Sequence, residues 1–157
     1  MTVDVLPLNE PTAAAGVAVF NVSGSLLLGR HAHDGRWATF GGSVEDGESV
    51  QGAALREVRE EVGLELEGLE ILGTFGGSPI YTVQYDDGSS ESYTVTMFGH
   101  VMSGDVIPRP DGSEILECRW FTPDALRTSV LAVDMAEIVP AALDWFRSRG
   151  GAGQVKG

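Results

Sequence analysis

The alternation of apolar and polar residues predicts a chain with more strands than helices. Segment 15–31 contains two apolar runs on either side of Asn21–Gly24, a pattern typical of a β-hairpin. Apolar residues that alternate or cluster between turn-forming residues predict four further strands. These strands are expected at residues 69–77, 79–85, 92–104 and 115–121.

A central helix is predicted from the residues that would cap it. Ser49 has the side chain of an N-cap, and Gly63 fits a left-handed residue after the last turn, which ends at Val62. Residues 33–49 before this helix are rich in glycine and polar residues and are expected to form a loop.

Two more helices are expected near the end of the chain. A short one begins within residues 122–126, and residues 133–150 have an amphipathic pattern in which Pro140 predicts a kink or a restart. Strands that surround one central helix favour an α/β or α+β sandwich with a mixed sheet. The expected organisation is an N-terminal arm at 1–12, a single domain at 13–149 and a flexible tail at 150–157.

Composition narrows the class of protein. The chain has 157 residues, 43% of them apolar, which suits one domain with a hydrophobic core. No apolar run approaches the roughly 20 residues of a membrane span, and the N-terminal sequence lacks the features of a signal peptide. A net charge of −13 argues against binding a nucleic-acid duplex, which depends on Lys and Arg. The single cysteine, Cys118, excludes an intramolecular disulfide and agrees with an expected cytoplasmic location.

The central helix carries an unfavourable cluster of charge. Glu57, Glu60 and Glu61 fall within a sector of about 100°, near the carboxyl end, where the helix dipole disfavours negative charge. An apolar stripe borders this sector, so the carboxylates lie beside the face expected to be buried. Clustered oxygen ligands are what Mg²⁺ binds, together with substrate phosphates. Taken alone, residues 56–61 are more typical of an ordinary solvated helix surface.

The spacing around the cluster is far more specific than the cluster itself. Gly42 is followed after five residues by Glu48, and after seven more by the run R-E-V-R-E-E-V-G-L at 56–64. This matches G-x5-E-x7-R-E-U-x-E-E-x-G-U, with U apolar, at every specified position, and a given window does so by chance at a rate below roughly 10⁻⁸. The pattern is the Nudix box, and the chain resembles the Nudix hydrolase family over its 23 residues. Weaker similarity covers the preceding hairpin and the segments W-x-x-x-G-G and E-x-x-E-x-R-W-F, which start at Trp37 and Glu114.

The resemblance implies an α/β/α sandwich in which the box forms a loop-helix-loop. It also implies hydrolysis of a phosphoanhydride bond in a nucleoside diphosphate linked to another moiety, with Mg²⁺ or Mn²⁺ as cofactor. By motif position, Glu57, Glu60 and Glu61 are the metal-binding and catalytic carboxylates, and Arg56 orients them. The other implied roles are the Gly41 carbonyl as an extra ligand, Glu48 as a brace for the loop, and Gly42 and Gly63 at turns that a Cβ would obstruct.

Attack of water on a diphosphate also requires a group that accepts a proton. Glu57 or a glutamate outside the box is expected to do this, since family members differ. Glu114 is the first distal candidate and Glu91 the second. Many members have proline before the paired glycines, whereas this chain has Phe40, a change expected to alter the loop without removing a ligand.

Other residues are candidates for contact with substrate, although an exposed polar role or packing in the core or a loop is the simpler explanation for each of them alone. A phosphate contact is expected from one of three residues: Arg30, His31 or His33. Stacking on a base is expected from one of three aromatic residues: Trp37, Phe75 or Tyr81. The segment S-P-I-Y at 78–81 resembles both the ADP-ribose-cleaving and the dinucleoside-polyphosphate branches of the family, so it does not select a substrate.

Two alternative functions remain open at this stage. A non-catalytic Nudix-like sensor would bind a nucleotide, although such modules usually lose box glutamates and this chain retains all of them. Isomerisation of an isoprenyl diphosphate would need a catalytic cysteine, for which Cys118 is available. The expected partner is a small nucleotide, and a homodimer is a candidate assembly because many relatives are dimers.

Overall fold

The computed structural model describes residues 11–77, 79–104 and 107–156, with side chains described as far as Arg149. Residues 1–10 of the expected arm lie outside these ranges, while Thr12, its last residue, begins the first strand. Within the described residues, no helix is long and apolar enough to cross a membrane.

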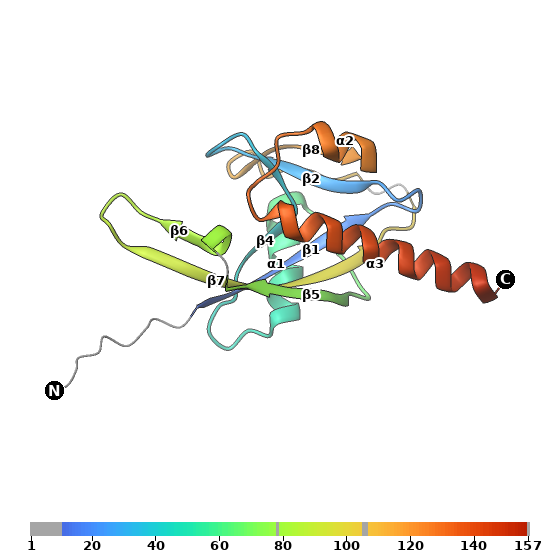
Figure 1. The fold of residues 1–157 in the computed structure, drawn as a ribbon, viewed down its shortest axis with the longest axis horizontal. Helices are drawn as coiled ribbons and strands as arrows, with labels where there is room; N and C mark the ends of the chain where they lie inside the picture. The colour runs from blue at the N-terminus through green and yellow to red at the C-terminus, as the bar shows by residue number, and fades with distance from the viewer. Residues whose placement is uncertain (1–10, 78, 105–106, 157) are drawn as a thin grey trace.

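Eight strands form one mixed sheet (Figure 1). They are β1 (Thr12–Phe20), β2 (Leu26–His31), β3 (Trp37–Ala38), β4 (Phe40–Ser43), β5 (Glu70–Gly76), β6 (Thr82–Gln84), β7 (Ser90–Val101) and β8 (Ile115–Phe121). The main path is β3-β2-β1-β7-β5, with β4 paired to β1, β6 to β7 and β8 to β2. β1 and β7 run parallel, and the other pairs are antiparallel, so the predicted mixed sheet is confirmed.

Helices cover both faces of this sheet. They are α1 (Val50–Val62), the 3-10 turn η1 (Pro79–Tyr81), α2 (Pro123–Thr128) and α3 (Met135–Lys156). α1 lies on one face and α3 on the other (Figure 1), which confirms the expected sandwich.

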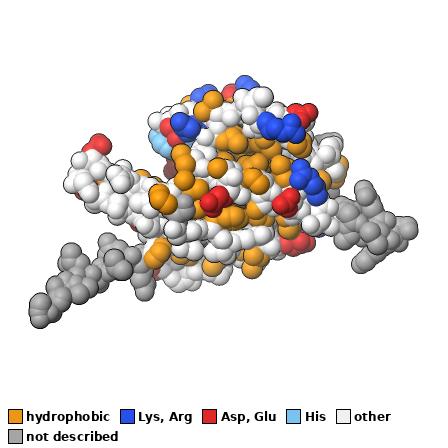
Figure 2. All heavy atoms as spheres, viewed as in Figure 1, with side chains coloured by type: hydrophobic (Ala, Val, Ile, Leu, Met, Phe, Trp, Pro, Cys, Tyr) orange, Lys and Arg blue, Asp and Glu red, His pale blue; other side chains and the backbone are white. Residues whose placement is uncertain are grey.

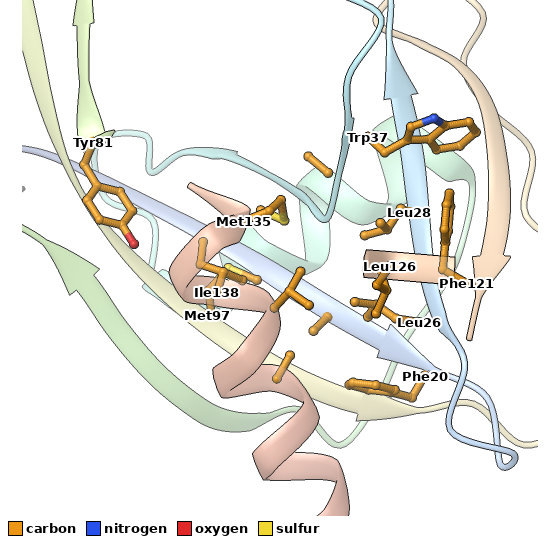
Figure 3. Packing of buried hydrophobic residues seen from close by; sticks show 14 residues of the cluster. Phe20, Leu26, Leu28, Trp37, Tyr81, Met97, Phe121, Leu126, Met135 and Ile138 are labelled. Carbon is orange, nitrogen blue, oxygen red and sulfur yellow. The ribbon is translucent and has the colours of Figure 1, made fainter. Parts of the chain in front are cut away.

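Strand alternation explains the two layers of core. Leu26 and Leu28 of β2 belong to the cluster under α3, whereas Leu27 belongs to the cluster under α1, because successive side chains of a strand point to opposite faces. Figure 3 shows the first cluster, in which Ile138 of α3 lies near Met97 of β7. Both faces are buried, so these strands are apolar without interruption. On the outer surface around α3, hydrophobic side chains lie among Arg and acidic ones (Figure 2).

The structure differs from the sequence prediction in four places. The expected loop at 33–49 contains the short strands β3 and β4, and the segment expected as a strand at 79–85 begins with η1. α3 is continuous through Pro140, so no restart occurs, although proline removes one helical N–H donor. The backbone of 150–156 continues α3, and the flexibility expected of the tail stays a prediction.

Candidate active site

Helix α1 is fixed at both ends and along one side. The Ser49 hydroxyl accepts a hydrogen bond from the Gly52 N–H at 2.9 Å, and Gly63 adopts φ 69°, so both predicted caps are confirmed. Val58 and Val62 are fully buried in the core cluster below α1. This orientation leaves Glu57 and Glu61 beside strand β4.

Two glycines allow β4 to lie close to β1 on one side and to helix α1 on the other. The Gly41 N–H donates to Glu61 Oε1 at 3.1 Å, and a Cβ at Gly41 would lie 2.5 Å from the Ala15 carbonyl oxygen. A Cβ at Gly42 would collide with the carboxylate of Glu57. Gly42 therefore lies within a strand and not in the expected turn, and the absence of its side chain makes room for Glu57.

The direction of the Gly41 carbonyl follows from the direction of its N–H. In a strand, the N–H and C=O of one residue point to the same side. Because the Gly41 N–H points to Glu61 of α1, the Gly41 carbonyl also lies on the side of β4 facing away from its partner β1.

Arg56 connects the glutamates of the box. Its guanidinium donates to Glu48 at 2.7 and 3.1 Å and to the Ser43 carbonyl at 3.0 Å, so Glu48 is joined to both the loop and the helix. Its Nη1 also donates to Glu57 and to Glu60, each at 3.2 Å. The hydrogen bonds from Arg56 lower the pKa of Glu48 to about 2, which keeps this carboxylate charged.

Glu61 is the most unusual acid of the site. Its side chain is 3% exposed. Burial, reinforced by the charge of Glu57, raises its pKa to about 8, although the Gly41 hydrogen bond acts in the opposite direction. Burial also raises the pKa of Glu57, which remains close to Arg56. A buried carboxylate that is costly to ionise suits a site in which a cation balances its charge.

The oxygen donors of the box suit a hard divalent cation, which prefers carboxylates and carbonyls. Glu57, Glu60, Glu61 and the Gly41 carbonyl are such donors, and Glu61 meets the further condition of burial without a cationic partner of its own in the described contacts. Glu57 and Glu60 are both turned toward Arg56. In the described part of the chain, no three acidic, His or Cys side chains surround a common point. Ligation by the three glutamates therefore stays a prediction.

A loop after β7 brings a distal glutamate toward the box. The N–H groups of Arg109 and Asp111 donate to the carbonyls of Val62 and Glu61, at 2.8 and 2.9 Å, which fastens the loop to the end of α1. The Asp111 carboxylate then accepts three backbone N–H groups, including that of Glu114 at 3.0 Å. The charge of Glu114 raises the pKa of both Glu57 and Glu61, so Glu114 lies within electrostatic reach of them.

Asp111 was not among the predicted site residues. Its only signal in the sequence is its place in P-R-P-D-G-S, at 108–113, where Asp commonly caps a turn with its own side chain.

The second distal candidate, Glu91, lies elsewhere. It accepts hydrogen bonds from Thr12 at 2.6 Å, Tyr93 at 2.8 Å and Tyr85 at 2.9 Å. These contacts belong to the hairpin of β6 and β7, which projects from the body of the sheet (Figure 1). The structure thus joins Glu91 to the base of this hairpin and not to the box.

A cavity of about 450 Å³ adjoins β4. Gly41 and Gly42 contribute to its wall, so the strand that contacts the box glutamates also borders the cavity. The other walls come from β1, from residues 31–34, from 80–95 and from the start of α3. A cavity of this size and mainly apolar lining is typical of a small-molecule site.

Three of the predicted substrate residues line this cavity: His31, His33 and Tyr81. Burial and the neighbouring His33 lower the pKa of His31. Tyr81 is 4% exposed and donates its hydroxyl to Glu137.

The other three predicted substrate residues lie elsewhere. Arg30 is ion-paired with Glu117 at 3.2 Å. Trp37 packs edge-on against Phe121, with ring centroids 5.0 Å apart. Phe75 packs against the core cluster under α3.

Asp134 also lines the cavity and was missed from the sequence, where it is a single acid within an apolar stretch. Burial raises its pKa. Cys118 is half-buried against the core under α1, and burial raises its pKa to about 11, which keeps the thiol protonated.

The α/β/α layers, with the helix of the box beside strand β4, define a Nudix-type domain. Comparisons with known proteins lead to the same family. The NUDIX domain family model matches residues 10–142. Nucleoside triphosphatase NudI of Escherichia coli is 41% identical over 109 residues, which cover 66% of this chain and 77% of that protein. NAD-capped RNA hydrolase NudC of Pseudomonas aeruginosa is 36% identical over 92 residues, or 59% of this chain, and the match spans only 29% of NudC.

Among solved structures, the NUDIX domain of Shewanella oneidensis NrtR, in complex with ADP ribose, superposes with a TM-score of 0.71. At 16% identity, over 90% of this chain and 93% of that one, it is similar in fold. The chain belongs to the Nudix family, which confirms the expected family and fold, and the relatives it matches are named as hydrolases.

Proposed function

We propose that this Nudix protein is a hydrolase that cleaves a phosphoanhydride bond in a nucleoside diphosphate linked to another moiety, and that it requires Mg²⁺ or Mn²⁺. The observation that carries the proposal is the double role of β4. Its Gly41–Gly42 segment contacts the buried box carboxylates and also forms part of the wall of a 450 Å³ cavity. A substrate in that cavity would have its phosphates beside the box.

Glu57, Glu60, Glu61 and the Gly41 carbonyl would hold the cation. When bound, it would neutralise phosphate charge and lower the pKa of a coordinated water. Arg56 holds Glu57 and Glu60 near each other, and Glu48 fixes Arg56 in turn. Glu57 or Glu114 would accept the proton of the attacking water.

The names of relatives suggest which substrates to test. NudI is named for nucleoside triphosphates, NudC for NAD-capped RNA, and a mouse relative that is 32% identical over 113 residues for oxidized purine nucleoside triphosphates. ADP ribose is present in the NrtR complex. A panel containing all four, together with dinucleotides and sugar nucleotides, is the direct approach.

The experiment is a screen of this panel with Mg²⁺ and with Mn²⁺, followed by variants. We expect Glu60→Gln and Glu61→Gln to abolish metal-dependent cleavage while circular dichroism stays unchanged. Glu65→Gln is the matched control, because Glu65 follows α1 and its side chain is 75% exposed. Unchanged activity in both box variants would refute the proposal. Cleavage in isotopically labelled water would identify the phosphorus that is attacked.

The alternative functions have less support in the structure. A sensor would retain nucleotide in calorimetry and give no product, but the intact box with its buried Glu61 favours catalysis. An isomerase would need a reactive thiol, whereas the pKa of Cys118 is raised to about 11. Absence of double-bond migration with isopentenyl diphosphate tests this second alternative.

A further inference from the structure

Two separate parts of the chain form facing walls of the cavity. One is the β6–β7 hairpin with η1, which contributes Tyr81, Val83 and Tyr93. The other is the start of α3, which contributes Met135 and Ile138. The hairpin leaves the body of the sheet at this point (Figure 1), so its position relative to α3 determines the width of the cavity between them.

A hydrogen bond joins the two walls. The Tyr81 hydroxyl donates to Glu137 Oε1 at 2.8 Å across 56 positions of sequence. Tyr81 is 4% exposed, and in Figure 3 its hydroxyl is directed toward α3. Burial and the bond to Glu137 both raise the pKa of Tyr81, so the phenol remains a donor at every working pH.

The hairpin has a second attachment, which serves as a comparison. At its base, Glu91 accepts hydrogen bonds from Tyr85 and Tyr93 within the hairpin and from Thr12 of β1. These bonds hold the hairpin to itself and to the sheet. They do not reach α3, so they do not determine how far the hairpin lies from α3 across the cavity.

The residues that line the cavity indicate which kind of chemical group the hairpin wall would contact. Among its described lining residues there is no Lys or Arg, and the ionisable ones are His31, His33, Asp34, Tyr81, Tyr93 and Asp134. Most of the remaining lining is aliphatic or aromatic. A fixed aromatic wall in such surroundings suits a flat, uncharged group better than a further phosphate.

We propose that Tyr81 and Glu137 are positioning residues, whose hydrogen bond holds the β6–β7 hairpin over the cavity and so sets its width for a planar, uncharged group of the substrate. The identity of the ligand rests on the proposed function. The attachment of the hairpin to α3 rests on the geometry alone. Loss of the bond would make the hairpin more mobile and weaken substrate binding, whereas the rate of the reaction at the box would not change.

The test uses Tyr81→Phe, which removes the hydroxyl and keeps the ring, and Glu137→Ala, which removes the acceptor. Glu137→Gln retains an acceptor oxygen and should restore most of the behaviour of the wild type. Tyr85→Phe is the matched control, because it also removes a hydroxyl bonded to a glutamate of the same hairpin, away from the cavity lining. The double variant Tyr81→Phe/Glu137→Ala shows whether the two residues act together.

Two readouts separate the attachment from the reaction. Hydrogen–deuterium exchange of the amides at 79–84 should be faster in Tyr81→Phe and Glu137→Ala than in Tyr85→Phe, which keeps the bond to α3. For the best substrate of the panel, KM should rise roughly fivefold, with kcat within about twofold of wild type. The dissociation constants of the α,β-methylene diphosphates of adenosine and guanosine should rise in parallel. The double variant should resemble either single one.

Unchanged exchange and unchanged KM in Tyr81→Phe would overturn the inference while leaving the proposed function intact. Equal effects of Tyr85→Phe, or effects that add in the double variant, would also overturn it. If the wild type cleaves nothing in the panel and binds neither methylene analogue, the proposed function fails. In that case the exchange of residues 79–84 still decides whether Tyr81 and Glu137 hold the hairpin.

Discussion

Replacing Glu61 with Gln should stabilise the metal-free protein at alkaline pH while it abolishes activity. Glu61 is 3% exposed, and its pKa is raised to about 8, chiefly by burial. The amide of Gln has nearly the same shape and still offers an oxygen to the Gly41 N–H, but it carries no charge. The variant therefore removes the cost of a buried charge and keeps the hydrogen bond.

The size of the effect follows from the difference in pKa. The ordinary value of 4.5 rises to about 8 in the folded protein, and one unit corresponds to about 1.4 kcal/mol. The full cost of ionising Glu61 is thus on the order of 3–5 kcal/mol. Below pH 4.5 the acid is protonated in both the folded and the unfolded states, so no cost exists. The cost grows as pH rises from 4.5 to about 8 and is complete above that, where it corresponds to a difference in Tm of roughly 10 °C.

The assay is thermal unfolding of the wild type and Glu61→Gln between pH 5 and pH 9 in the presence of EDTA. The difference in Tm should be small at pH 5 and largest at pH 9, where the variant should melt higher. Adding Mg²⁺ at pH 9 should raise the Tm of the wild type and leave the variant nearly unchanged. The exposed Glu65→Gln serves as a control and should follow the wild type. A Tm difference that is equal at both pH values, or a variant less stable at pH 9, would refute the reasoning.

Three further predictions concern the helix cap Ser49, the strand glycine Gly42 and the distal glutamates outside the box. Ser49→Ala loses the bond to the first turn of α1 and should lower stability by about 1 kcal/mol, measured by urea unfolding, with no change in kcat. Gly42→Ala places a Cβ against the Glu57 carboxylate, so kcat/KM should fall roughly 100-fold with an unchanged circular dichroism spectrum; full activity would contradict this account of the strand. Glu114→Gln should lower kcat by roughly tenfold or more, whereas Glu91→Gln should not, and the reverse order in steady-state kinetics would place the hairpin in the reaction.

The parts of the structure that depend on neighbouring residues could be predicted from the sequence. Ser49 and Gly63 define the ends of α1 because the cap interactions lie within a few residues of each. The β-hairpin at 15–31 was predicted for the same reason, since a turn joins its two strands directly. The roles expected of Arg56 and Glu48 come from the resemblance to the Nudix box, and in the structure these two side chains are joined by hydrogen bonds.

The parts that depend on distant segments could not be predicted in this way. β4 is four residues long and contains two glycines, which carry little strand propensity, and it becomes a strand because β1 pairs with it. The burial of Glu61 depends on that approach of β4 and is invisible in the helix alone. The cavity joins residues from 31–34, 80–95 and 132–138, so neither its existence nor the place of Asp134 in it has a local signal.

The dependence on distant segments also explains why only some of the predicted substrate residues line the cavity. Trp37 and Tyr81 are both aromatic residues near turns, and the sequence does not distinguish them. Trp37 packs against Phe121 in the core, while Tyr81 lines the cavity and bonds to Glu137. Which role an aromatic residue takes depends on what the fold places opposite it.

The central claim is that the box glutamates hold a divalent cation beside the substrate phosphates. Its most direct test is anomalous diffraction from crystals soaked with Mn²⁺ and an α,β-methylene nucleoside diphosphate. The account predicts a peak within about 2.0–2.6 Å of oxygens from Glu57, Glu60 or Glu61, with the nucleoside in the cavity lined by Tyr81. A nucleotide bound there without any peak at these carboxylates would contradict it.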